Sequence, residues 1–420
     1  MFKPEAPRMT KQRSMLVFDS AYTYKMIEER GLHAIITGKD LNGFFDQVWT
    51  VHAMAGLQAS KTSRDYGRPL THRLTTKHFF IEGRRGRFHL LRYCHPLNFL
   101  LGQVDLFFYL LSIAFANRIT LVRSEDPLYH GFFAFLIGKI LIIPFLVGVW
   151  GNPRNIRRST GKPLMPRLFP HPAIEVLLEY FILHQASLVM TQNYDNAAYV
   201  LSRGIPRSRI KIFRLTNLLD EVHFVKPSSR PSSSDDLQEF VDYPRPFVLV
   251  VSRLQELKLV HHVVLAAGLL KSWGLTPTFI LAGDGPYKDD LRELAKSQDV
   301  FSQIIMCGNK SQAWLSRVMP SVDAVAVPLA GRGLAEVAFA AAPVVAYDVD
   351  WHSELIVNRQ TGMLAPYMDY HTFASDLKFL LSNPISAKQM GVSLRERAIS
   401  KLDPLIADLR QAKILRQLLK

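Results

Sequence analysis

Short apolar runs alternate with longer amphipathic segments along most of the chain. Runs of consecutive hydrophobic residues that end in polar or glycine-rich turns are typical of strands buried on both faces of a parallel sheet. The segments between these runs carry apolar residues at helical spacing. The pattern therefore predicts two series of alternating strands and helices, one in each half of the chain.

In the first half, strands are predicted at 14–20, 47–51, 119–122, 145–149, 188–191 and 210–213. Helices are predicted at 22–30, 131–141, 173–186 and 194–203. Polar residues follow several strands, at the edge where open α/β sheets bind ligands. Candidates on this edge are His52, Asp126, His130, Gly151 and Asn152. For His52, a surface or capped histidine is the plainer interpretation.

The second half repeats this organisation, with strands predicted at 247–251, 278–282, 303–306, 324–327 and 344–347. Helices are predicted at 260–273, 287–297, 311–319 and 334–341. The sequence predicts an α/β protein of two doubly wound, Rossmann-like domains that face a central cleft. The expected parts are a first domain at 1–225, a linker rich in proline and serine at 226–245, a second domain at 246–385, and basic helices at 386–420 that return to the first domain.

The composition is that of a globular protein, with 48% hydrophobic and 21% charged residues among 420. Cys94 and Cys307 are far apart and form no metal or redox spacing, which favours a reducing, cytoplasmic setting. Residues 1–13 are polar and are not typical of a secretory signal. Two apolar stretches, 99–116 and 132–150, approach membrane-spanning length, but polar or helix-breaking residues interrupt each. Buried core is the favoured interpretation, with membrane insertion as the alternative.

The net charge of +15 indicates a polyanionic neighbour. Nine Lys or Arg residues lie between 61 and 92, mixed with aromatic residues, and the chain contains no recognised nucleic-acid module. An anionic membrane surface or a phosphorylated substrate is therefore favoured over nucleic acid as the partner of this stretch. A solvated loop without a partner is the alternative interpretation. A second basic surface is predicted from Arg154, Arg157, Arg158, Lys162 and Arg167, which no acid interrupts before Glu175.

A glycine-rich turn, Gly331-Arg332-Gly333, lies between a predicted strand and a predicted helix. Such turns let main-chain N–H groups approach an anion, and the helix N-terminus adds partial positive charge. Arg332 offers a charged fork to phosphate oxygens, whereas the carboxylate of Glu336 is suited to sugar hydroxyls such as a ribose diol. A plain βαβ crossover is the alternative interpretation.

The region around this turn resembles family 4 of the retaining glycosyltransferases, which have the GT-B fold. The motifs in order are Arg253 and Lys258 after a strand, LAGDGP at 281–286, the turn 331–334, Glu336, Glu354, and Thr361-Gly362. The resemblance implies that Arg253 and Lys258 hold the diphosphate of a nucleotide sugar. It also implies that Glu336 binds the ribose. Further donor-binding residues are then Gly331, Arg332, Gly333, Leu334, Glu354 and Asn309.

The chain departs from the family pattern at several positions. Pro328 stands where the family has the first glutamate of its E-x7-E motif, and Leu259 stands where a glycine usually follows the lysine. The first strand is followed by Asp19 rather than by a glycine-rich loop, and Trp150-Gly151-Asn152 replaces an acceptor-side histidine. His130 or His52 is the candidate replacement for that histidine.

The expected activity is a metal-independent hexosyl transfer, without a cofactor, from a UDP- or GDP-sugar to a glycan or lipid-linked acceptor. Synthesis of a cell-surface polysaccharide or glycolipid is the expected setting, with peripheral contact to the cytoplasmic face of an anionic membrane and no nucleic-acid partner. The alternative is a non-catalytic GT-B protein that binds a nucleotide sugar or a partner enzyme, which Pro328 motivates. A nucleotide-sugar epimerase is a further alternative, but its catalytic acids cannot be placed.

Overall fold

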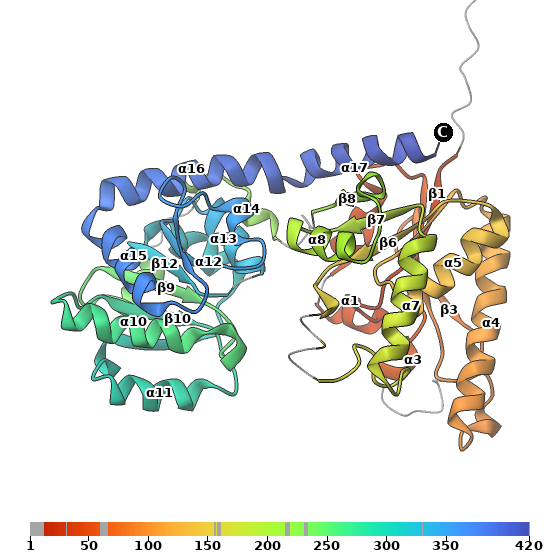
Figure 1. The fold of residues 1–420 in the computed structure, drawn as a ribbon, viewed down its shortest axis with the longest axis horizontal. Coiled ribbons are helices and arrows are strands. Elements are labelled where there is room, and N and C mark those ends of the chain that lie inside the picture. Colours follow the sequence, from red (N-terminus) through yellow and green to blue (C-terminus); the bar gives the residue numbers. More distant parts are fainter. Residues whose placement is uncertain are drawn as a thin grey trace, which may run out of the picture. The chain divides into compact units, whose positions relative to one another are not determined.

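The computed structural model divides into two compact units (Figure 1). Unit 1 comprises Met1–Arg214 with Ala407–Lys420, and unit 2 comprises Leu215–Ile406. The described residues are 12–30, 32–58, 66–154, 157, 161–214, 219–230, 234–329 and 331–419.

Unit 1 is built on an eight-stranded sheet in the order β3-β4-β2-β1-β5-β6-β7-β8. Its strands are β1 (Ser14–Phe18), β2 (Gln47–His52), β3 (Leu70–Arg73), β4 (His78–Glu82), β5 (Leu121–Ser124), β6 (Phe145–Val149), β7 (Leu188–Thr191) and β8 (Ile210–Ile212). All neighbours pair in parallel except β3 and β4, which are antiparallel. The central strands are buried on both faces, as their continuous apolar runs predict.

Helices cover both faces of this sheet. Those described are α1 (Tyr24–Arg30), α2 (His33–Thr37), α3 (Ala55–Gln58), α4 (His95–Ala116), α5 (Tyr129–Leu141), α7 (Pro172–Gln185), α8 (Tyr194–Ser202) and α17 (Pro404–Leu418). Residues of α4, α5, α7 and α8 share one core cluster with the side chains of one sheet face. On the opposite face, Ala412 and Leu415 of α17 pack against Met15 and Val17 of β1.

Unit 2 contains a six-stranded, fully parallel sheet in the order β11-β10-β9-β12-β13-β14. Its strands are β9 (Phe247–Val251), β10 (Thr278–Ala282), β11 (Ile304–Gly308), β12 (Ala324–Val327), β13 (Val344–Asp348) and β14 (Met363–Pro366). Its helices are α9 (Ser234–Leu237), α10 (Val260–Ser272), α11 (Lys288–Ser297), α12 (Gln312–Val318), α13 (Arg332–Phe339), α14 (His352–Leu355), α15 (Tyr370–Ser382) and α16 (Pro384–Leu402). One core cluster joins α10, α11 and α15 to one face, and a second joins α12, α13 and α16 to the other. The doubly wound architecture predicted for each half is therefore confirmed.

Strands β3 and β4 lie inside the basic stretch 61–92, where no strand was predicted. β3 is largely exposed and polar, so it lacks the apolar run that marked the other strands. Strand β14 was also missed. Residues 59–65, with the first basic positions of that stretch, lie outside the described residues.

The segment predicted as a linker, 226–245, packs onto unit 2 instead. Arg230 donates hydrogen bonds to the carbonyl oxygens of Ser316 and Phe339 (2.7 and 3.0 Å), and Phe240 is buried in the core. Asp236 accepts two hydrogen bonds from Arg317 (2.6 and 2.9 Å). Serine and proline content suggested a linker, but buried contacts attach this segment to the fold. The boundary between the units falls between Arg214 and Leu215 rather than after 225.

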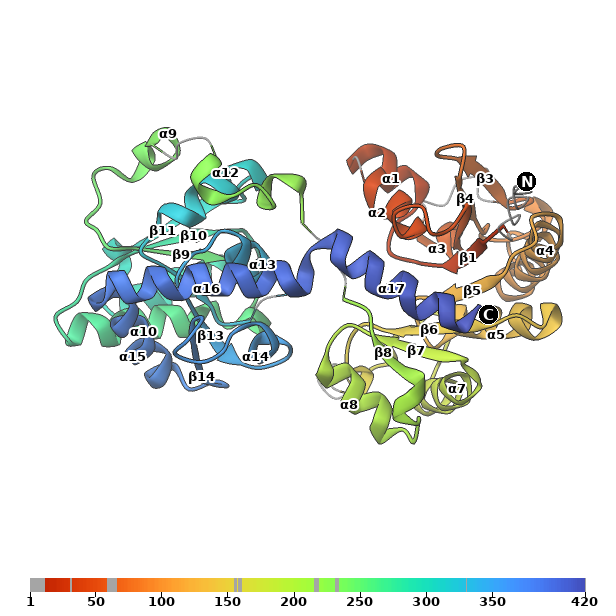
Figure 2. The ribbon, with the colours of Figure 1, turned by 90° about the horizontal axis from the view of Figure 1, so that it is seen from above.

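The two C-terminal helices belong to different units, although both were expected to pack on the first domain. Helix α16 packs against α13 in unit 2, and its Leu394 and Ala398 are buried in that core. Helix α17 packs on unit 1 from Ala407 onward. Figure 2 shows both helices in blue, α16 over the sheet of unit 2 and α17 over that of unit 1.

Candidate functional site

A pocket of about 520 Å³ lies in unit 2, beyond the carboxyl ends of β9, β10, β11 and β12. Seven residues that the sequence singled out line it: Arg253, Lys258, Asn309, Gly331, Arg332, Gly333 and Glu336. They come from three separate segments, which follow β9, β11 and β12, and the parallel sheet brings these segments to one edge. The structure therefore brings these seven residues together, and their roles in binding remain predictions.

Two cations that line this pocket have no ion pair in the described chain. Arg253 follows β9 and is exposed, and Lys258 ends a 3-10 turn, Glu256–Lys258, and is half-buried. Burial lowers the pKa of Lys258 and the positive charge of Arg253 lowers it further, whereas the negative charge of Asp350 acts in the opposite direction. Neither side chain has an ion pair in the part of the chain that the structure describes. Like charges held together in this way are stabilised by a bound anion.

Leu259 follows the lysine in place of the glycine that the family pattern has there. Its backbone is left-handed, with φ of 56°, and it precedes the first residue of α10. Its side chain is buried in the core beneath α10. The turn therefore keeps the conformation that glycine favours, and the leucine offsets its backbone strain by burying apolar surface.

The glycines of the LAGDGP turn have a structural role. A Cβ at Gly283 would lie 1.8 Å from the carbonyl oxygen of Ser252, and one at Gly285 would lie 2.2 Å from that of Leu254. The amide of Leu254 donates to the carbonyl oxygen of Asp284 at 3.0 Å. Only glycine allows this close approach, which fixes the backbone on either side of Arg253.

Arg332 and Glu336 form an ion pair instead of acting separately. Helix α13 begins at Arg332, two residues before the predicted start, so the two side chains lie one turn apart. Arg332 Nε donates to Glu336 Oε1 at 2.6 Å, and Arg332 Nη2 lies 3.6 Å from Asp220 Oδ1. Glu336 is buried. Arg332 therefore holds the carboxylate of Glu336 in place, and its charge is largely compensated before any phosphate binds.

Sequence reasoning missed Lys310, Gln312 and His223. Lys310 lines the pocket and pairs with Glu239 at 2.7 Å. Gln312 also lines the pocket, and its Oε1 lies 2.7 Å from Nε2 of the fully buried His223. Burial lowers the pKa of His223, so the ring is neutral at pH 7. The polar run Asn309–Gln312 at the end of a strand was an available signal, whereas His223 lies in the range that was assigned to the first domain.

Two predicted donor residues stand apart from the pocket lining. The side chain of Leu334 is fully buried in the core, so its backbone alone is available to a ligand. Glu354 lies in α14, and its carbonyl oxygen accepts a hydrogen bond from Arg397 at 3.1 Å. The lining residues described for the pocket do not include Glu354.

The acceptor-side candidates lie at one edge of the unit 1 sheet, because β2, β1, β5 and β6 are neighbours. Asp126 contacts Nδ1 of His130 through its carboxylate and accepts a hydrogen bond from the Leu128 amide at 2.9 Å. His130 and His52 are both fully buried. The interpretation of His52 as a surface histidine is therefore wrong, and neither ring presents surface to an acceptor in this structure.

A further charged pair at this edge was not anticipated. Asp19, directly after β1, lies 2.5 Å from the ammonium group of Lys39, and both are largely buried. Burial acts to raise the pKa of Asp19, but Lys39 outweighs it through its charge and hydrogen bond, so the pKa is about 2. Asp19 is therefore a fixed negative charge where the family pattern has a glycine-rich loop.

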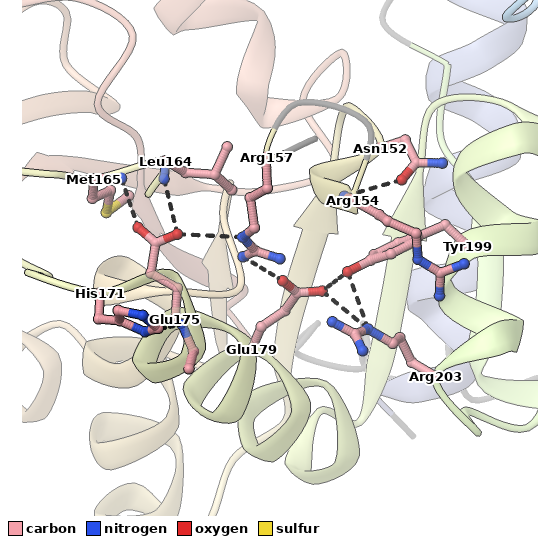
Figure 3. Close-up of polar contacts among 11 residues, drawn as sticks. Asn152, Arg154, Arg157, Leu164, Met165, His171, Glu175, Glu179, Tyr199 and Arg203 are labelled. Atoms are coloured by element: carbon pink, nitrogen blue, oxygen red, sulfur yellow. Dashed lines mark hydrogen bonds and ion pairs between the residues drawn. The ribbon is translucent and has the colours of Figure 1, made fainter. Parts of the chain in front are cut away.

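The segment after β6 is tied down by two buried glutamates rather than forming an open basic surface (Figure 3). Arg157 donates to Glu179 at 2.7 Å and to Glu175 at 3.4 Å. Glu175 also accepts the amides of Leu164 and Met165 at 2.8 and 2.7 Å. The predicted second basic surface is thus wrong at Arg157, because acids of α7 fold back onto it. Arg158 lies outside the described residues.

Asn152 and Gly151 begin this segment and are half-buried. The Asn152 side chain accepts a hydrogen bond from the Arg154 amide at 3.2 Å and lies 3.5 Å from the Asp195 carboxylate. These contacts order the start of the loop next to the carboxyl end of β6. The acceptor roles of Gly151 and Asn152 remain predictions.

Comparison with known proteins gives a consistent result. Residues 235–397 match the family model described as Glycosyl transferases group 1. The chain is 24% identical over 280 residues to an alpha-D-kanosaminyltransferase of Streptomyces kanamyceticus, covering 66% of this chain and 69% of that protein. Anabaena HepE, solved with UDP and with UDP-glucose, superposes with TM-scores of 0.66 and 0.64 at 15% identity, over 97% and 96% of this chain. The same two alignments cover 100% and 99% of the HepE chain.

WaaG, described as a glycosyltransferase involved in lipopolysaccharide biosynthesis, superposes with a TM-score of 0.59 at 12% identity. That alignment covers 96% of this chain and 99% of WaaG. At these identities the solved structures establish the fold of both units, which is GT-B, and not a substrate.

Proposed function

The chain belongs to the group 1 glycosyltransferases, and we propose that it transfers a hexose from a UDP- or GDP-sugar to a glycan or lipid-linked acceptor. The observation that supports this most directly is the pair of cations, Arg253 and Lys258, which line the pocket of unit 2 and have no ion pair in the described chain. Departure of a nucleoside diphosphate builds negative charge on phosphate, and fixed cations stabilise that charge as it develops. We propose that these cations suffice without a metal ion.

In this proposal, Glu336 binds the ribose hydroxyls and Arg332 holds its carboxylate in place. The amides of Gly331 and Gly333 face the diphosphate at the first turn of α13, where the helix dipole favours an anion. The sugar acceptor binds to unit 1. The link to polysaccharide or glycolipid synthesis is supported by the fold that the chain shares with WaaG. Retention of configuration follows the family resemblance.

The test is a panel of UDP- and GDP-sugars incubated with the purified full chain, with and without a membrane lipid extract. Release of free nucleoside diphosphate from one donor, rising with the extract, is the expected result. UDP-sugars come first, because HepE was solved with UDP and UDP-glucose. Turnover is expected to persist in EDTA, and the anomeric configuration of the product is read by NMR.

Arg253→Ala and Lys258→Ala are each expected to reduce turnover by about 100-fold. Arg292→Ala is the matched control, because Arg292 lies in the same unit but pairs with Asp289 on α11. Unchanged rates in the first two variants would remove the diphosphate assignment. Tight nucleotide binding without turnover of any donor would instead favour a non-catalytic protein, with Pro328 as the residue to explain.

A further inference from the structure

Helix α4 carries an apolar stripe on its outer side. It is 22 residues long with a mean hydropathy of 1.8 over its most apolar window, and only 33% of that window is buried. The exposed residues Leu97, Leu100, Val104, Phe108 and Phe115 recur at helical spacing along its length. The favoured expectation of buried core for this stretch is therefore wrong for its outer side.

Two neighbouring helices extend the stripe into a continuous surface. Phe107 of α4 contacts Phe133 of α5, and Phe135 of α5 contacts Phe181 of α7, so the three helices pack side by side. Helix α7 exposes Ile174, Leu177 and Phe181, and α5 exposes Phe132 and Ile140. Figures 1 and 2 both show α4, α5 and α7 on the same side of unit 1. We call these exposed side chains the apolar face. A surface of this extent on a soluble unit marks an interaction site.

The acidic side chains of these helices are all buried or paired. The acids of α7, Glu175 and Glu179, are fully buried, α5 has none, and Asp105 of α4 pairs with Arg87 at 3.1 Å. By contrast, α11 of unit 2 exposes Asp289 and Glu293 to solvent, as a solvated helix does. The apolar face thus has no uncompensated carboxylate on its three helices, whereas Lys139 is exposed beside it.

An amphipathic protrusion leads into the face. Phe88, Leu90 and Tyr93 precede α4, and Leu90 and Tyr93 are 92% and 81% exposed. Arg92 is exposed next to them and lies with its guanidinium 4.8 Å from the Tyr93 ring centroid. Aromatic and basic side chains with a protruding leucine are the residues that anchor proteins at the boundary between lipid headgroups and acyl chains.

We propose that the apolar face and this protrusion dock unit 1 onto an anionic phospholipid bilayer. The docking is peripheral: Leu106, Leu110 and Ile113 on the inner side of α4 belong to the core of unit 1, and spanning would remove them from it. The headgroups contact Arg92 and Lys139. A second copy of the chain is a poorer occupant, because self-pairing would place cations opposite cations without an acid between them.

Arg84, Arg85 and Arg87 belong to the same basic stretch, 61–92, as Arg92. The structure pairs Arg87 with Asp105 and buries one guanidinium nitrogen of Arg85, so these side chains are less available than Arg92. The docking proposal does not rest on the proposed transfer reaction. Its test therefore measures binding to lipid in the absence of any nucleotide sugar.

The experiment is co-flotation of the full chain with vesicles of phosphatidylcholine and phosphatidylglycerol in equal parts, and with vesicles of phosphatidylcholine alone. Wild type is expected to bind the mixed vesicles more tightly, and carbonate at high pH is expected to release it. The triple variant Leu100→Glu, Phe108→Glu, Leu177→Glu is expected to lose at least about tenfold in affinity. Arg92→Gln is expected to lose about fivefold on the mixed vesicles only.

The matched control carries Val241→Glu, Ile385→Glu and Leu409→Glu, at positions that are 63%, 89% and 61% exposed but lie off the face. It is expected to bind as wild type does, and urea unfolding checks that both triple variants fold. The proposal is overturned if wild type does not bind, or if the first triple variant binds equally well. It is also overturned if wild type is a dimer that this variant dissociates while neither binds vesicles.

Discussion

Arg253 and Arg332 both line the pocket of unit 2, but their charges are compensated differently. Arg253 has no ion pair in the described chain, whereas Arg332 lies 2.6 Å from the buried carboxylate of Glu336. The sequence placed both near a diphosphate. The register of α13, which no motif reveals, decides which of them is free to meet it.

This difference predicts unequal effects on nucleotide binding. Arg253→Ala is expected to weaken binding of UDP by about 100-fold, because it removes an uncompensated charge. Arg332→Ala is expected to weaken binding by about tenfold or less at pH 8, because its charge is already paired. Isothermal titration of each variant with UDP measures both values.

Arg332→Ala also leaves the buried carboxylate of Glu336 without the cation that orients it. Equal losses of UDP affinity in the two alanine variants would show that Arg332 contacts the phosphates directly.

At the scale of elements, the strands most readily predicted were those buried on both faces, such as β1, β6 and β9. Their apolar runs are dictated by burial, so the sequence contains the signal. The polar edge strand β3 has no such signal, and its pairing with β4 depends on tertiary contact. The buried Arg157 pair was also hidden, because Glu175 and Glu179 meet it only after the chain turns into α7.

That network predicts a large effect of removing one glutamate. Glu179→Ala leaves Arg157 short of its nearest partner and removes the contact with the Tyr199 hydroxyl. We expect the free energy of unfolding to fall by about 3 kcal/mol, because a buried cation loses compensation. Glu293→Ala, on the exposed surface of α11, is the control and is expected to change it by less than about 0.5 kcal/mol. Urea unfolding followed by circular dichroism measures both, and equal small effects would contradict the assignment.

The raised pKa of Asp408, a residue of α17, predicts how pH affects the stability of the folded protein. Burial raises the pKa of Asp408, the charge of Asp40 raises it further, and Arg123 lowers it, for a value of about 6. The folded state thus retains a proton that the unfolded chain releases near its ordinary value of 3.8. The stabilisation from this proton is complete below pH 3.8 and is lost as the pH rises through 6.

The asparagine of the Asp408→Asn variant cannot ionise. The variant should therefore not lose this stability as the pH rises. The variant is expected to be more stable than wild type above pH 6 by about 1 kcal/mol, a value reduced because the side chain keeps some contact with water. The difference is expected to shrink towards zero below pH 4. Unfolding midpoints of the full chain at several pH values give the measurement. A constant difference across this range would mean that Asp408 keeps its ordinary pKa.

At the scale of the whole molecule, the two units share an architecture but carry different surfaces. Unit 2 gathers cations and glycine turns at the carboxyl edge of its sheet, and two of these cations, Arg253 and Lys258, have no ion pair in the described chain. Unit 1 buries charged pairs at the equivalent edge and exposes an apolar face on its outer helices. The division of labour that we propose, with the nucleotide sugar on unit 2 and the membrane on unit 1, follows from these surfaces.

This division predicts where a nucleotide slows hydrogen exchange. The residues that line the pocket all come from unit 2, so saturating UDP is expected to protect amides around Arg253–Leu259, Asn309–Leu315 and the first turns of α13. At about 100 times its dissociation constant, UDP stabilises the binding unit by about 2.7 kcal/mol. Amides of α4 and α7 are expected to exchange at unchanged rates. The Arg253→Ala variant with the same UDP concentration is the control, in which protection should largely disappear. Protection centred on unit 1 would place the nucleotide elsewhere and would remove the basis for the donor assignment.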